Sequence, residues 1–265
     1  MVTSTQGHMN KYGHARIRLV LAIAAALALP TASTAQVKVI TSGGFSAALL
    51  EILPAFQKAT GITVTTARGA SQGKGPDTIG AQLRRGVPAD VVILAREGLD
   101  ELIAEGRIAA QTDVDLAQTP LGVAVRAGAA KPDINTVDAF KQALLRAKGI
   151  NFPSSTTGIY MTDKLFPQLG IARELSGKIK DSGIAALVGG ESEIAVQPVS
   201  ELLHMPGVDF VGPVPAEIQY VSVFSTAIVA GSKEHESAKR LIAFLTSEDA
   251  KTATRKHGME PARSR

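Results

Sequence analysis

The stretch VKVITSGGFSAALL at residues 37–50 decides the fold, because it joins an apolar strand to an amphipathic helix through a Ser-Gly-Gly turn. A helix N-terminus carries unpaired backbone N–H groups and a partial positive charge. Gly43 and Gly44 let a ligand approach that backbone closely, and Ser42 adds a hydroxyl. The stretch therefore predicts an anion-binding helix start. The alternative is a plain cap, since Ser and Gly are favoured there in any case.

The segment before this stretch, residues 1–35, has the three parts of an export signal. Basic residues come first, an apolar run follows at 19–29, and small residues fill 30–35. The apolar run is too short to span a bilayer core of roughly 30 Å. We expect cleavage near Ala35 and a periplasmic mature protein, translated from the first methionine or from Met9.

Composition excludes several classes of function. Without residues 1–35 the chain has 25 Lys and Arg against 24 Asp and Glu, and no basic cluster is interleaved with aromatic residues. Nucleic-acid binding is therefore not expected. The chain has no cysteine, which excludes disulfides, zinc-thiolate sites and thiol nucleophiles. No two histidines share a helical turn, so we expect no metal site, and no cofactor motif is present.

Strand-like runs alternate with helical patterns over the first part of the mature chain. The expected elements are, in order, strand 37–41, helix 46–59, strand 62–67, helix 78–85, strand 90–94 and helix 98–105. This alternation is typical of a parallel β-sheet covered by helices.

A second apolar run at 115–126 leads into a second set of elements. The last strand and helix of the chain cannot bury both their faces alone, so we expect them to pack back onto the first set. The fold class predicted is α/β, with two lobes that are each a mixed sheet flanked by helices. Lobe 1 comprises residues 36–118 and 222–265, and lobe 2 comprises residues 119–221. A ligand cleft is expected between them.

Four stretches of the chain resemble a known family, the periplasmic substrate-binding proteins of ABC transporters with type II topology, in the molybdate-binding branch. These stretches are SGGFSAALLEILPAFQKATGITV at 42–64, PADVVILAREGLDELIAEGRI at 88–108, LGVAVRAGAAKPDI at 121–134 and EIAVQPVSELL at 193–203. The resemblance implies that Ser or Thr hydroxyls and backbone N–H groups at helix starts in both lobes hold an anion. The matching positions are Ser42, Ser71, Ser155 and Gln197.

The chain departs from the molybdate binders in its second loop, GASQGKGPDTIGAQL at 69–83, which is longer than usual and contains Lys74. A tyrosine common late in that site has no counterpart at 195–197. A cation beside Ser71 suggests a ligand that carries carboxylates. The long-loop version of the fold resembles the aconitate isomerases, a family of bacterial periplasmic enzymes. This resemblance implies interconversion of trans- and cis-aconitate by allylic proton transfer, with no cofactor.

Two other functions remain open from the sequence. The chain is alternatively a solute-binding protein that delivers molybdate or a small carboxylate to an ABC permease without catalysis, or the ligand module of a sensor. All three readings predict a small anionic ligand, a tri- or dicarboxylate or an oxyanion, and we expect a monomer. The fold alone does not separate them, because function depends on the site.

The candidate ligand-binding residues gather at the expected helix starts and in the long loop. Phe45 is alternatively a core residue, Gln72 an exposed loop residue and Ser155 a helix cap. The full set is Ser42, Gly43, Gly44, Phe45, Ser71, Gln72, Lys74, Ser155, Thr156 and Gln197.

The sequence does not identify the group that moves the proton. The candidates are His204, Tyr160 and Lys74, although His204 is alternatively a solvated loop histidine and Tyr160 a core residue with a wet tip. Asp77 is expected to cap a helix. Glu193 is expected to lie in a polar surface turn.

Overall fold

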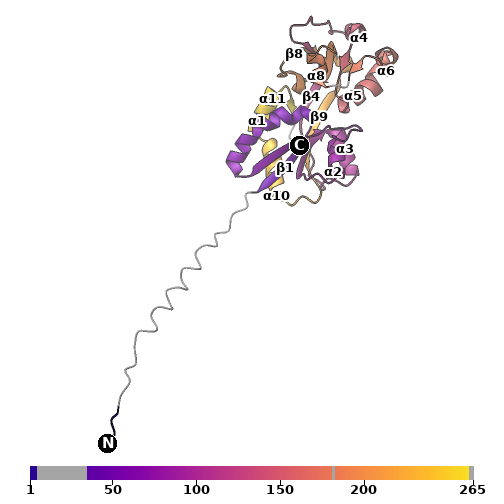
Figure 1. The fold of residues 1–265 in the computed structure, drawn as a ribbon. Helices are drawn as coiled ribbons and strands as arrows, with labels where there is room; N and C mark the ends of the chain where they lie inside the picture. The colour runs from indigo at the N-terminus through magenta and orange to yellow at the C-terminus, as the bar shows by residue number, and fades with distance from the viewer. Residues whose placement is uncertain (5–34, 181–182, 263–265) are drawn as a thin grey trace. The chain divides into compact units, whose positions relative to one another are not determined.

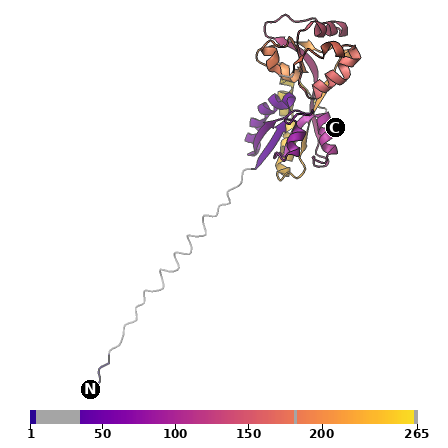
Figure 2. The same ribbon diagram turned by 45° about the vertical axis from the view of Figure 1, so that its right-hand side comes forward.

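The computed structural model describes residues 1–4, 35–180 and 183–262. The chain divides into a unit Met1–Thr34 and a compact unit Ala35–Arg265, and the second unit holds every described helix and strand (Figures 1 and 2). Apart from residues 1–4 and Ala35, the expected export signal lies outside the described residues. No helix within the described part of the chain is long and apolar enough to cross a membrane.

The first part of the sheet is parallel, as its alternating pattern predicts. Strands β1 (Gln36–Thr41), β2 (Thr63–Arg68) and β3 (Val91–Ala95) lie in the order β2-β1-β3. The connecting helices are α1 (Gly43–Thr60) and α2 (Ile79–Arg84), and α3 (Arg96–Ala104) follows β3. The expected strands agree with the observed ones to within a residue, whereas α1 begins three residues earlier than predicted.

Two long strands connect the two parts of the sheet. Strand β9 (Val221–Ile228) pairs antiparallel with β3 on one side and with β4 (Val114–Arg126) on the other. The second half of β4 pairs with β7 (Ile194–Pro198) and β8 (Val208–Pro213). Because β4 is 13 residues long, it pairs with strands of both parts of the sheet.

The second part contains the short strands β5 and β6, parallel to one another and to β7. Helix α5 continues through a π-helical turn, η1, into α6. The remaining elements are α4 (Val137–Arg146), β5 (Ile150–Asn151), α5 (Thr156–Tyr160), η1 (Met161–Leu165), α6 (Phe166–Leu169), α7 (Ala172–Leu175), β6 (Ile179–Lys180), α8 (Ile184–Val188), α9 (Val199–Leu202), η2 (Ala216–Ile218), α10 (His235–Leu245), α11 (Glu248–Lys256) and β10 (Glu260–Pro261).

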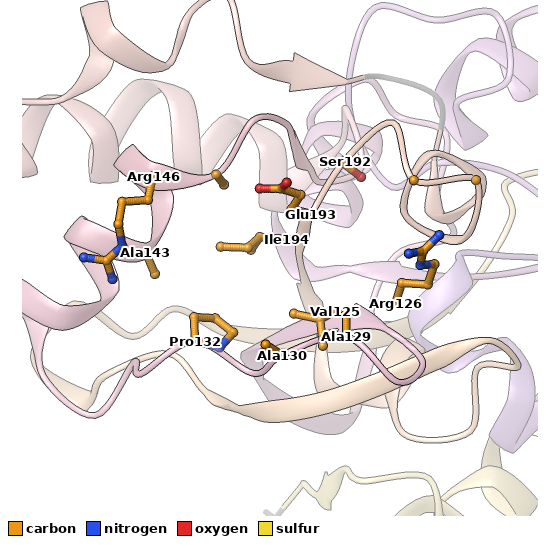
Figure 3. A pocket seen from close by; sticks show the side chains of 13 residues that line it. Val125, Arg126, Ala129, Ala130, Pro132, Ala143, Arg146, Ser192, Glu193 and Ile194 are labelled. Carbon is orange, nitrogen blue, oxygen red and sulfur yellow. The ribbon is translucent and has the colours of Figure 1, made fainter.

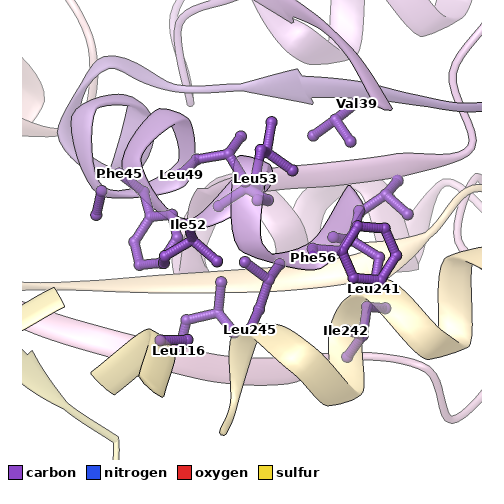
Figure 4. Packing of buried hydrophobic residues seen from close by; sticks show 14 of the residues in the cluster. Val39, Phe45, Leu49, Ile52, Leu53, Phe56, Leu116, Leu241, Ile242 and Leu245 are labelled. Atoms are coloured by element: carbon purple, nitrogen blue, oxygen red, sulfur yellow. The ribbon is translucent and has the colours of Figure 1, made fainter. Parts of the chain in front are cut away.

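Buried apolar side chains form two large cores. In the first, the apolar face of α1 packs onto α10 and the first strands, as Figure 4 shows for Leu49, Phe56 and Leu245. The C-terminal strand and helix therefore join the first core, as predicted. A second core surrounds β7 and includes Phe140 and Phe166. Each fully buried side chain of this size contributes about 1.5–3 kcal/mol. The lobe boundaries at residues 118/119 and 221/222 stay a prediction.

Candidate functional site

Several strands end where helices begin, and these junctions surround one cavity of about 110 Å³. Strand β1 leads through Ser42 into α1, and β7 leads directly into α9. Ligands of open α/β sheets bind at such carboxyl ends of strands. The lining residues are Ser42, Gly43, Ala70, Ser71, Ala95, Pro153, Ser155, Thr156, Thr157, Pro198, Glu201, Ser222 and Phe224.

Two buried hydroxyls in this lining have no hydrogen-bond partner among the described residues. Ser42 precedes α1 with an extended backbone and makes no side-chain cap bond, and Thr156 is the first residue of α5. A buried hydroxyl without a partner costs about 1–3 kcal/mol. A ligand with acceptor oxygens would offset that cost. It would also meet the free N–H groups at the start of α1, a helix of 18 residues.

The long loop at 69–83 is held in place beside the cavity by serine hydroxyls. Ser71 Oγ accepts a hydrogen bond from the backbone N–H of Ala95 at 2.9 Å. Ser155 Oγ accepts from the backbone N–H of Gln72 at 3.2 Å, which joins the loop to the segment before α5. The predicted cap of α2 was wrong by one residue, because Thr78, not Asp77, accepts from the N–H of Ala81.

Glu201 is a residue of the cavity lining that the sequence did not point to. It lies in the first turn of α9 and lines the cavity, where it is the one titratable side chain among the described residues. A Cβ atom on Gly43 would lie 3.0 Å from Glu201 Oε2, so the absent side chain of Gly43 leaves room for this carboxyl group. Burial raises the pKa of Glu201 to about 7, and the charge of Arg68 opposes that rise.

Five predicted ligand residues do not line this cavity. Phe45 is fully buried in the first core, with its ring centroid 6.5 Å from that of Phe224, and Gly44 packs against the same ring. The Gln72 side chain donates to Glu101, away from the cavity. Gln197 is buried and donates to Asn151 Oδ1, and Lys74 is exposed. Ser42, Gly43, Ser71, Ser155 and Thr156 do line it.

The three proton-transfer candidates also lie outside the lining. His204 is exposed, contacts the backbone carbonyl of Lys256 through Nε2 at 3.1 Å and meets His257 edge-on. The Tyr160 hydroxyl donates to the carbonyl of Ile218 at 2.8 Å, and burial raises its pKa. The local sequence does not specify these tertiary contacts, and a role in proton transfer stays a prediction for these residues.

Replacing Lys74 with Ala is expected to change the affinity for a carboxylate ligand by less than about threefold, because an exposed charge outside the cavity contributes little. Calorimetric titration of trans-aconitate into both proteins measures this. A tenfold or larger loss would show that the long loop does bring this cation to the ligand.

The architecture and site are those of a solute-binding protein, and comparison with known families agrees. The profile of the bacterial extracellular solute-binding proteins matches residues 37–260. The chain belongs to this family, whose members bind small solutes. Within the described residues no three His, Cys, Asp or Glu side chains are placed to share a metal ion.

Three known proteins are similar to this chain in sequence or in structure. An aconitate isomerase from a Pseudomonas species is 38% identical over 227 residues, which cover 84% of this chain and 87% of that protein. The periplasmic molybdate-binding protein of Azotobacter vinelandii has a TM-score of 0.68 at 19% identity, covering 86% of this chain and 100% of that one. The substrate-binding domain of a putative molybdenum ABC transporter from Clostridium difficile has a TM-score of 0.63 at 18% identity, with the same coverages. The predicted mixed α/β periplasmic-binding-protein fold is thus confirmed.

Proposed function

We propose that this protein interconverts trans-aconitate and cis-aconitate in the cavity between α1, α5 and α9. The observation that carries the proposal is Glu201, a carboxyl group with a pKa of about 7 among otherwise neutral donors. A general acid–base group works best when its pKa lies near the working pH. The 38% identical aconitate isomerase supports the same reaction.

Neutral donors would hold the substrate carboxylates. The hydroxyls of Ser42 and Thr156 have no partner among the described residues, and the first N–H groups of α1 are free to donate. Donors of this kind, aimed at developing negative charge, contribute about 3–4 kcal/mol each to the transition state. A tricarboxylate uses several of them at once, which fits a site that spans three helix starts.

The proton transfer uses one group twice. Ionised Glu201 takes a proton from the substrate methylene group, and the C–H electron pair forms the new C=C bond as the old one opens into an enolate-like anion. The donors at the helix starts stabilise this charge. Protonated Glu201 then returns the proton to the other end of the allylic system, which leaves the double bond shifted and Glu201 ionised again.

Delivery of a small anion to an ABC permease is the second candidate, favoured by the neutral hydroxyls of Ser42, Ser155 and Thr156 in the same lining. A transport protein needs those donors and no titratable group. Transport would leave Glu201 without a role. We therefore favour catalysis over transport.

The cellular setting forms part of the proposal. We expect export to the periplasm with cleavage near Ala35, and a monomer with lobes 36–118 plus 222–265 and 119–221. Mass spectrometry of the exported protein measures its first residue. Light scattering measures its mass in solution.

The test is to incubate the purified mature protein with trans-aconitate and follow cis-aconitate by chromatography, with molybdate titrated in parallel by calorimetry. Turnover at the rate of a typical enzyme, about 1–10³ per second, supports the proposal. Tight molybdate binding without turnover would replace it with transport.

The rate should depend on pH through Glu201. Its folded pKa is raised to about 7, so the carboxyl group is protonated and inactive as a base well below pH 7. We expect kcat/KM to fall about tenfold for each unit of pH below the pKa and to level off above it. A profile that is flat from roughly pH 5.5 to 8 would contradict this assignment.

A further inference from the structure

A second and larger cavity lies at the opposite end of β7. The first cavity contacts Pro198, the last residue of β7, whereas the second contacts Ile194, its first residue. Four residues of strand rise separate these two positions by roughly 13 Å. The second cavity has a volume of about 590 Å³, within the range of sites for small molecules.

The walls of the second cavity combine apolar and polar residues. They come from the end of β4, the segment that leads to α4, the last turns of α4 and the start of β7. The apolar lining residues are Val125, Ala129, Ala130, Pro132, Ala143, Ala147 and Ile194.

Two guanidinium groups stand at opposite ends of this cavity, Arg126 from β4 and Arg146 from α4 (Figure 3). Within the described part of the chain neither arginine has an ion pair. Glu193, the one acid that the described residues place in the lining, accepts from the backbone N–H of Lys148 at 3.0 Å and lies 3.8 Å from its Nζ. The cavity therefore has an excess of positive charge.

The loop that forms the third wall is fixed and offers one free hydroxyl. The backbone N–H groups of Gly189, Gly190 and Ser192 all donate to carbonyls of α8. Ser192 is only 2% exposed, and its Oγ has no partner among the described residues. A buried hydroxyl in the lining without a partner is an independent sign that a polar ligand group belongs there.

We propose that this cavity binds an organic dianion whose two carboxylates are joined by an apolar chain. Each carboxylate pairs with one arginine, since guanidinium matches carboxylate geometry. The chain lies on the apolar floor, and Ser192 donates to one carboxylate. The site is separate from the isomerisation cavity and does not depend on the function proposed for it.

The experiment titrates glutarate, adipate and pimelate into the mature protein and follows the side-chain N–H signals of Arg126 and Arg146 by NMR. Hexanoate, with one carboxylate, and sulfate, with no apolar chain, are the comparison probes. The variants are Arg126→Gln and Arg146→Gln, and Arg173→Gln is the matched control because Arg173 is an exposed arginine outside the lining. Thermal unfolding checks that each variant is folded.

We expect saturable shifts with at least one dicarboxylate, about tenfold weaker binding in each lining variant, and no change in the Arg173 variant. Hexanoate and sulfate should bind about tenfold more weakly or not at all. Absence of saturation at millimolar dicarboxylate would overturn the proposal. So would affinities that are equal in all variants, or equal binding of sulfate.

Discussion

Replacing Glu201 with Gln is expected to lower kcat for aconitate isomerisation by about 10²–10⁴-fold, the usual contribution of a general acid–base group. Glutamine keeps the shape of the side chain but accepts no proton from carbon. No other titratable side chain lines the cavity within the described residues, so none replaces the lost carboxyl group. Chromatographic rates and calorimetric affinity for trans-aconitate, measured on the same preparations, separate catalysis from binding.

Affinity should be retained or increased in the Glu201→Gln variant, because the substitution removes a negative charge beside an anionic ligand. The matched control is Glu191→Gln, since Glu191 is an exposed acid before the start of β7, outside the lining. Its rate should equal that of the parent protein. A Glu201→Gln variant with full activity would reject the residue assignment, whereas an inactive parent protein would reject the isomerase function itself.

Stability gives a further check on this variant. The folded pKa of Glu201 is raised to about 7 from 4.5, so its contribution to stability is fully present below pH 4.5 and is lost as the pH rises through 7. Above pH 7 the Glu201→Gln variant should therefore be no less stable than the parent protein. Urea unfolding at pH 8 measures this and excludes misfolding as the cause of lost activity.

The features predictable from sequence are those that local patterns specify. The alternation of apolar strands and amphipathic helices predicted the parallel strands β1, β2 and β3, because periodicity and burial act over a few residues. The Ser-Gly-Gly turn predicted a helix start after β1, although α1 begins three residues earlier than expected, and Ser42 and Gly43 do line the cavity.

The predicted ligand residues that do not line the cavity are those whose direction depends on tertiary packing. Phe45 follows the turn directly, yet its ring enters the first core because β9 brings Phe224 beside it. Gln197 lies next to the end of the buried strand β7, but its side chain donates to Asn151 on the neighbouring strand β5. No pattern along the chain specifies which of these side chains faces a cavity built from three separate helix starts.

Glu201 was not predicted because its local sequence already has a structural explanation. An acid in the first turn of a helix is ordinarily explained by the helix dipole alone, so its sequence context looks structural. The available signal was its position just after β7, a strand buried along its whole length. Where a strand of an open α/β sheet ends, the residues that follow are placed to reach a ligand.

Replacing Gly44 with Ala should lower the free energy of unfolding by about 1–3 kcal/mol, the usual cost of overpacking a core. Alanine is a better helix former than glycine by about 1 kcal/mol, which alone would stabilise α1. Here the steric term is larger, because a Cβ atom on Gly44 would lie 1.9 Å from Cζ of the Phe224 ring. That ring is only 3% exposed, so it moves only at the expense of its other packing contacts. Urea unfolding of both proteins measures the difference.

The ring of Phe224 also lines the first cavity, so its displacement by Gly44→Ala should weaken trans-aconitate binding as well as stability. Gly177→Ala is the matched control, since a Cβ atom there meets nothing within 4 Å, and it should change stability by less than about 0.5 kcal/mol. Trimming the ring in the double variant with Phe224→Leu should restore part of the loss, because the two residues are in direct contact and their effects are coupled. If Gly44→Ala alone is neutral or stabilising, helix propensity outweighs packing at this helix start, and Gly44 is present for a reason other than the ring behind it.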